Sequence, residues 1–219
     1  MKTSKKILIA FLSVFCISLL SVMITVENPG DSRNENMEYV EVALPNFNVI
    51  VVQEGARVQL NTNDSCNIKY SHKKDALKEI PYQLLTDTLI LKPAKSGDRN
   101  FHYTINLKLI NALIVEGGNV DVNLRQDSIL VTNSQKGNVN VFKNSSFKHL
   151  QLEANEKSRS NIYTANIKSL MMHVNNAEVF SNTRISSVNL DAENKANITL
   201  QHVKKLTVNC DSTSTYRIY

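Results

Sequence analysis

Short apolar phrases recur along the second half of the chain at a nearly constant interval. Each phrase reads apolar, any residue, apolar, which is typical of a β-strand with one buried face. The six phrases begin at residues 113, 129, 150, 170, 188 and 206, so successive starts lie 16, 21, 20, 18 and 18 residues apart. A period near 20 residues with strands inside it indicates a solenoid, in which similar coils stack on one another.

A second, shorter strand-like phrase follows each of the first ones. The second phrases lie at 120–122, 139–141, 162–163, 179–180, 198–200 and 216–218. Two short strands in the same order in every repeat predict parallel pairing between repeats, and connections between parallel strands are right-handed. The sequence therefore predicts an all-β protein: a right-handed parallel β-helix of about six rungs.

Residues 39–109 also alternate between apolar and polar positions, but without the period of 20. They predict a β-rich section that precedes the rungs. At the other end, the last rung finishes at Tyr219 with little sequence left to cover it. We expect this rung to present an open edge through which the chain can associate with a second copy.

The first 26 residues predict a membrane anchor or an export signal. Lys2, Lys5 and Lys6 precede an uncharged run at 7–26, which is long enough for a transmembrane helix across a hydrocarbon layer of ~30 Å. A cleaved signal sequence, or a lipoprotein signal at Cys16, stays open as an alternative. The lysines before the run place the amino end in the cytoplasm.

The domain organisation follows from that N-terminal segment. Residues 27–38 are polar and rich in turn formers, which predicts a linker, and residues 39–219 form the exported domain. The expected location is the cell envelope. Residues 27–219 would lie in the periplasm if the chain stays anchored in the inner membrane, and the protein would be exported if the N-terminal segment is cleaved.

Charge and cysteine content narrow the classes of partner. The chain carries a formal net charge of +5, and without the three leading lysines the remainder carries 5 − 3 = +2. This near balance argues against a nucleic-acid partner, which needs a concentrated basic face. Cys66 precedes all the rungs and Cys210 lies in the last one, so we expect both to be free thiols rather than a disulfide.

Several segments resemble a known family. They are the opening at 44–52, the Gly-x-x-Val-x-Leu sequence at 55–60, the segment at 87–91 and the repeated short strands beyond 113. Together they make residues 39–219 similar to the head GIN domain, a family described as auto-transporter adhesins. The resemblance implies an exported β-helical domain and offers no established catalytic residues to carry over.

One predicted outward column contains the residues best suited to acid-base or cation chemistry. Aligning the phrases places Glu116, Thr132, Glu153, His173, Asp191 and Asn209 at the same position of successive rungs. Glu153, His173 and Asp191 would then be neighbours, so that two carboxylates flank an imidazole. The alternative is a solvated ladder of polar side chains without a specific role.

The second phrases contain an aromatic stripe. Phe142, Tyr163 and Phe180 fall at or beside outward positions of successive rungs. Such rings on a flat β surface can stack on sugars or accept a protein partner. The alternative is that they are buried at the corners of the rungs.

No motif for a nucleophile, a phosphate-binding loop, a cofactor or a metal ion stands in the sequence. The leading hypothesis is thus a non-enzymatic envelope protein that presents a β-helical domain for binding or adhesion to a glycan or a protein. A small polysaccharide-active enzyme using Glu153, His173 and Asp191 is the first alternative. A self-assembling structural β-helix is the second.

Overall fold

The computed structural model describes residues 37–73, 82–93, 102–163 and 165–219, and the regular elements in these ranges are all β-strands. The predicted anchor or signal at 1–26 lies outside the described residues, as does nearly all of the predicted linker at 27–38. Among the residues described, no helix is long and apolar enough to cross a membrane. The first strand begins at Met37, two residues before the predicted start of the domain.

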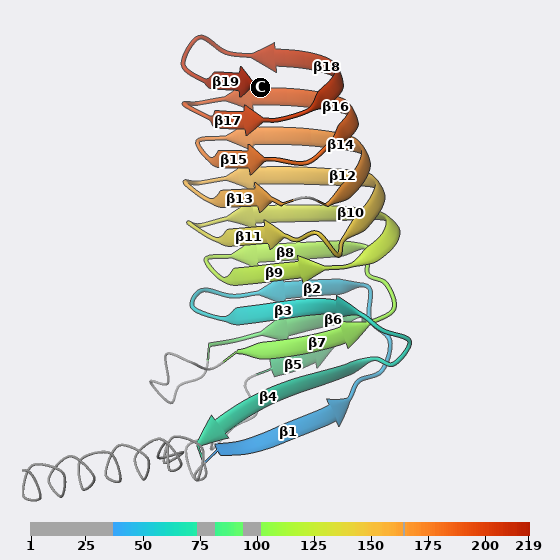
Figure 1. Ribbon diagram of the computed structural model, residues 1–219. Helices are drawn as coiled ribbons and strands as arrows, with labels where there is room; N and C mark the ends of the chain where they lie inside the picture. Colours follow the sequence, from blue (N-terminus) through green and yellow to red (C-terminus); the bar gives the residue numbers. More distant parts are fainter. Residues whose placement is uncertain (1–36, 74–81, 94–101, 164) are drawn as a thin grey trace, which may run out of the picture. The chain divides into compact units, whose positions relative to one another are not determined.

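The strands form two sheets, which are the two walls of a solenoid (Figure 1). Sheet A contains, in spatial order, β1 (Met37–Ala43), β4 (Asn67–Lys73), β7 (Tyr103–Leu107), β3 (Arg57–Thr62), β9 (Asn119–Asn123), β11 (Asn138–Val141), β13 (Arg159–Ile162), β15 (Glu178–Ser181), β17 (Asn197–Leu200) and β19 (Thr215–Ile218). Sheet B contains β18 (Val203–Cys210), β16 (Ile185–Glu193), β14 (Asn166–Asn175), β12 (Ser146–Asn155), β10 (Arg125–Ser134), β8 (Ala112–Glu116), β2 (Val49–Val52), β6 (Thr88–Leu91) and β5 (Tyr82–Leu85).

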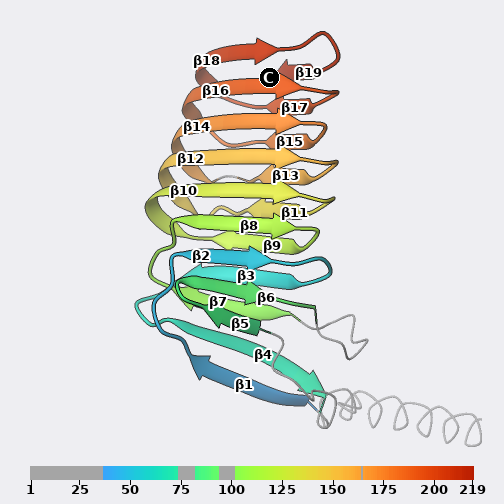
Figure 2. The same ribbon diagram turned by 180° about the vertical axis from the view of Figure 1, so that it is seen from behind.

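Six successive strand pairs, from β8 with β9 to β18 with β19, make the regular part of the stack. Each pair contributes one strand to each sheet, and five turns of the coil lead from the first pair to the last. All pairing between these coils is parallel, and from behind the long strands of sheet B lie one above another (Figure 2). The expected β-solenoid is confirmed.

The predicted alignment of the phrases is correct in the last five rungs, from Ile129 onward, and wrong in the first. Leu150 pairs with Leu170, Val188 and Leu206 follow in the same column, and this matches the expected register. Leu113, however, pairs with Val131 and not with Ile129, so the first step is 18 residues rather than 16. Glu116 accordingly pairs with Ser134 and does not belong to the column of Thr132.

A buried polar residue explains this error. The inward position that continues the column beyond Val131 is occupied by Asn133, which is fully buried. Its Nδ2 donates hydrogen bonds to the backbone oxygen of Arg159 at 2.8 Å and to Oγ of Ser160 at 3.0 Å. Because the interior of this coil accepts an amide, the apolar phrase in the sequence stops one inward position early.

The β-rich N-terminal section extends the same stack, but not in sequence order. Strand β2 lies between β6 and β8, and β3 lies between β7 and β9, with parallel pairing on both sides. The first coil in the sequence, made of β2 and β3, therefore lies between the second coil, made of β6 and β7, and the third coil, made of β8 and β9. Strand β4 pairs antiparallel with β7, and β1 lies beside β4 at the end of sheet A; β5 pairs antiparallel with β6 and ends sheet B.

The core runs along the axis of the coil, because alternate side chains of both sheets point inward. Buried Leu, Ile and Val side chains fill it from β2 to β17. Each fully buried side chain of this size stabilises the fold by roughly 1.5–3 kcal/mol, so that stacking several coils excludes water where one coil cannot.

The last coil is covered on one side only. Val203, Leu206, Val208 and Cys210 pack against the core but are only partly buried. In β19, Tyr216 and Ile218 are 46% and 44% exposed. Cys210 and Cys66 are both free, as expected from their separation in the stack.

Candidate functional site

The outer face of sheet A carries ladders of asparagine amides. Asn161 Nδ2 donates to Oδ1 of Asn140 at 2.9 Å, and Asn140 Nδ2 donates to Oδ1 of Asp121 at 2.9 Å, each one coil further along. Parallel in-register strands place equivalent side chains directly above one another, so an asparagine on every coil can bond to the next. Each amide in such a ladder keeps one N–H and one oxygen lone pair for a ligand.

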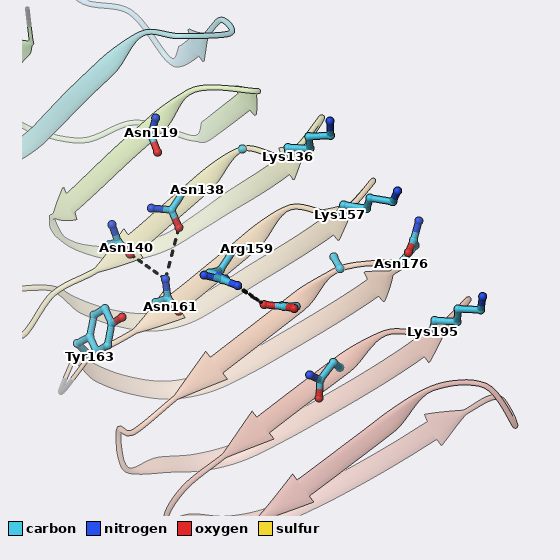
Figure 3. Close-up of a pocket in the computed structure, with 14 residues that line it drawn as sticks. Asn119, Lys136, Asn138, Asn140, Lys157, Arg159, Asn161, Tyr163, Asn176 and Lys195 are labelled. Carbon is cyan, nitrogen blue, oxygen red and sulfur yellow. Dashed lines mark hydrogen bonds and ion pairs between the residues drawn. The ribbon is translucent and has the colours of Figure 1, made fainter. Parts of the chain in front are cut away.

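An open groove of about 610 Å³ lies over these ladders. Figure 3 shows amide side chains across its floor and three lysines in a row at one edge. The residues that line it are Asn119, Lys136, Gly137, Asn138, Asn140, Lys157, Arg159, Asn161, Tyr163, Asn176, Ala177, Glu178, Lys195 and Asn197. Its four cationic side chains and one carboxylate sum to +3.

The lysine row occupies one corner column of the solenoid. The strand register aligns Gly55, Gly117, Lys136, Lys157, Asn176 and Lys195 on successive coils. All six have a left-handed backbone, with φ of 80°, 76°, 63°, 62°, 50° and 67°. Glycine and asparagine adopt this conformation readily, whereas it costs another residue roughly 1–2 kcal/mol.

One ion pair crosses the groove. Arg159 donates from Nε and Nη2 to Oε2 of Glu178 on the next coil, at 3.0 and 2.7 Å. Both side chains remain more than half exposed, so the pair adds little stability. It neutralises the one carboxylate in the lining and leaves the charge of the lysine row uncompensated.

The aromatic stripe lies on the same outer face. Phe142 and Tyr163 stack with ring centroids 5.8 Å apart and an interplanar angle of 23°. The ring centroid of Phe180 lies 6.1 Å from that of Tyr163, with an interplanar angle of 51°. Phe180 is less well stacked because it pairs in register with Asn161, two positions before Tyr163. All three rings are half-buried. Tyr163 lines the groove, and Phe142 lines a smaller hollow beside it.

The acidic and histidine column lies on the outer face of sheet B, opposite the groove. Glu153, His173 and Asp191 occupy one column on successive coils, in the expected order. His173 Nδ1 lies 3.2 Å from Oδ2 of Asp191, but its Nε2 lies 3.3 Å from Oε1 of Glu193 rather than near Glu153. Glu153 accepts hydrogen bonds from Thr132 and Gln151 instead.

This column is a flat, half-exposed surface. His173, Asp191 and Glu193 are 43%, 52% and 43% exposed in their side chains. Within the described ranges, no group of three His, Cys, Asp or Glu side chains is arranged to hold a metal ion. The geometry is that of a charged ladder on the outer face of a sheet.

Sequence reasoning found the aromatic stripe and the acidic column but missed the groove. Asn119, Asn138 and Asn197 each open a second strand, and the lysines each stand two residues before such a strand. That recurrence is visible in the sequence. Its meaning depends on the register, which shows that these positions form columns on one face.

Comparisons with known proteins find similarity at the level of structure. No protein-family model matches the sequence, and no curated protein is similar to it. A "putative lipid binding protein" from Parabacteroides distasonis superposes with a TM-score of 0.60 at 12% identity, covering 85% of this chain and 98% of its own. A "putative adhesin" from Bacteroides fragilis gives 0.56, also at 12% identity, over 85% and 98% of the two chains.

A "putative adhesin" from Parabacteroides merdae gives a TM-score of 0.50 at 12% identity, over 85% of this chain and 97% of its own. These proteins share the fold. Each of the three is matched over nearly its whole length, and the likeness is one of fold.

Proposed function

We propose that the protein is a non-enzymatic, adhesion-type binding protein of the cell envelope, and that its binding surface is the outer face of sheet A. The observation that carries this proposal is the juxtaposition of three half-exposed aromatic rings with an open groove lined by amides. Rings offer apolar faces to sugars, and amides donate to and accept from hydroxyl groups. The surface therefore suits an extended glycan that runs across several coils.

Two further observations support a binding role. The histidine on sheet B stands between carboxylates on an open, flat surface, where water is not excluded and a substrate cannot be enclosed. The proteins of similar fold carry the names "putative adhesin" and "putative lipid binding protein", which fit binding rather than catalysis. Membership of the head GIN family is part of this proposal.

The envelope location rests on the N-terminal sequence. Residues 7–26 form an uncharged run behind three lysines, which suits either an anchor or an export signal. An anchor followed by the polar linker at 27–38 would hold the solenoid at the outer side of the inner membrane. The intact mass of the protein recovered from cell membranes tests this: a chain that retains residues 1–26 is anchored, and one that lacks them is exported by a cleaved signal.

The binding role is tested with the full chain, purified in mild detergent, on a panel of envelope glycans. We expect at least one glycan to bind without turnover, and Tyr163→Ser to weaken that binding about tenfold. Tyr39→Ser is the matched control, because Tyr39 is 77% exposed on β1 and does not line the groove. Cleavage of a bound glycan would refute the non-enzymatic role.

Self-association through the last coil is a second candidate function. It is favoured by the exposed apolar side chains Tyr216, Ile218 and Tyr219 on the open end of the stack. Strand β18 is the edge of sheet B and β19 is the edge of sheet A, so their free backbone groups can pair with another chain. Light scattering across a concentration series tests it: a monomer at every concentration excludes this role, and Val208→Glu should abolish any oligomer that forms.

A further inference from the structure

The three lysines at the corner of the groove hold a left-handed backbone conformation, as do the residues directly before them, Gln135, Glu156 and Asn194. At the same column position, Gly55, Gly117 and Asn176 meet the left-handed requirement at little cost. Lys136, Lys157 and Lys195 do not, and together they store a few kcal/mol of strain. Two consecutive left-handed residues close the turn in each of these three coils, and the second of them, always a lysine, is the one that lines the groove.

The lysine side chains are also free of partners. All three are exposed, and none forms an ion pair or a side-chain hydrogen bond within the part of the chain that is described. Elsewhere the solenoid does pair its lysines, as Lys148 with Asp127 at 2.7 Å and Lys69 with Glu41 at 3.0 Å. The corner row therefore keeps three uncompensated positive charges beside the groove.

The spacing of the row suits a linear ligand that runs along the stack. Neighbouring coils lie about 4.8 Å apart, so Lys136 and Lys157 are one step apart and Lys157 and Lys195 are two. An extended polysaccharide advances by a comparable length for each sugar ring. Acidic groups on successive or alternate sugars would therefore meet the lysines in register.

The side chains on the floor of the groove indicate which class of polymer it can bind. Asn119, Asn138 and Asn176 donate no side-chain hydrogen bond inside the described structure, so their amide N–H groups are free for ligand oxygens. These groups match sugar hydroxyls. A nucleic acid would instead require a stronger basic field and several aromatic platforms, whereas the lining carries +3 and one aromatic ring.

We propose that the groove binds an acidic polysaccharide, with its acidic groups on Lys136, Lys157 and Lys195 and its hydroxyls on the asparagine ladders. This inference rests on the proposed function and names the ligand class for the same face. It assigns a role to the lysine column that is separate from that of the aromatic rings.

Binding of the full chain to polygalacturonate and to its methyl ester tests the inference directly, because esterification removes the charge and keeps the sugar backbone. Dextran sulfate and dextran form a second pair, which separates sulfate from carboxylate recognition. We expect each acidic polymer to bind at least tenfold more tightly than its neutral counterpart, with an affinity that falls as salt rises.

The variant with Lys136→Asn, Lys157→Asn and Lys195→Asn removes the charges and leaves a residue that tolerates left-handed backbone. It should lower the affinity for the acidic polymer about fivefold for each lysine, or about 100-fold in all. The control changes Lys168, Lys204 and Lys205 of sheet B to Asn. It makes the same change in net charge on exposed residues of the opposite face and should leave binding unaltered.

Three results would overturn the inference. They are equal affinity for acidic and neutral polymers, an equal loss in the control variant, and tighter binding of single-stranded DNA than of either acidic polysaccharide. Binding of neutral glycans alone would refute the acidic ligand and leave the binding role intact. If no glycan binds, the binding role itself fails.

Discussion

Truncating a leucine should cost far more in the middle of the stack than at its open end. Leu170 and Leu206 occupy the same inward column, two coils apart, so Leu→Ala removes the same atoms from the same register position. Leu170 is 0% exposed and has a coil on each side, whereas Leu206 is partly buried and has a coil on one side only.

The expected magnitudes follow from this difference. Leu→Ala in a closed core costs the transfer of the removed atoms plus the cavity left behind, about 3–4 kcal/mol at Leu170. At Leu206 part of the side chain already contacts water and no closed cavity forms, so we expect about 1–2 kcal/mol. Met171, which neighbours Leu170 but is 51% exposed, serves as the control, and Met171→Ala should cost less than about 0.5 kcal/mol.

Urea unfolding of the full chain measures these differences, with fluorescence and circular dichroism compared because a stack of coils can unfold in steps. Equal losses of unfolding free energy at Leu170 and Leu206 would refute the reasoning, since the last coil would then be as well covered as the middle of the stack. In that case a second copy must close the open end. A large loss at Met171 would show that the inward and outward columns are assigned to the wrong faces.

Three further predictions concern substitutions of single residues. Tyr103 donates a hydrogen bond to the backbone oxygen of Lys92 at 2.7 Å, and burial raises the pKa of its hydroxyl. As pH rises, the hydroxyl of Tyr103 therefore loses its proton in the unfolded chain before it does in the folded one, and the free energy of unfolding falls above about pH 10. Tyr103→Phe should flatten that fall in urea melts between pH 8 and 11. The same change should cost about 1 kcal/mol at neutral pH, because the hydrogen bond is lost. A Cβ at Gly137 would lie 2.4 Å from Oδ1 of buried Asn133, so Gly137→Ala should destabilise the protein by about 1–3 kcal/mol in the same melts, and an unchanged midpoint would contradict this packing. Lys157→Gly removes the left-handed strain of about 1–2 kcal/mol and adds about 0.5–1 kcal/mol of backbone entropy cost, so a net gain in melting temperature is expected and a loss would show that the strain argument is wrong.

The repeated phrases were sufficient to predict the architecture because the burial rule inside a solenoid is local. An alternating phrase identifies its own inward face, and a regular period aligns it with the next phrase. The alignment failed where the rule has an exception. Asn133 is polar and fully buried, and only its two hydrogen bonds to the following coil explain why it lies inside.

The surface was less predictable than the core. The aromatic stripe was recognised because its residues are rare and conspicuous, yet Phe180 stands two positions away from the register of Phe142 and Tyr163. Glu153, His173 and Asp191 were aligned correctly and Glu116 was not. The second carboxylate at His173 comes from Glu193, on the next coil and two positions along the strand. Such diagonal contacts depend on side-chain length and rotamer, which the spacing of residues does not specify.

The sequence by itself determined the class of fold, the sequential stacking beyond residue 113 and the inward columns, because each follows from the local alternation of apolar and polar residues. Only the tertiary structure decided where the coil of β2 and β3 lies. It stands between the coil of β6 and β7 and the coil of β8 and β9, and strand pairing across such long connections has no local signal. The tertiary structure also decided that Lys136, Lys157 and Lys195 form one column beside the asparagine ladders. That arrangement depends on the register of neighbouring coils, which hydrogen bonds and buried side chains set together, and no single repeat contains it.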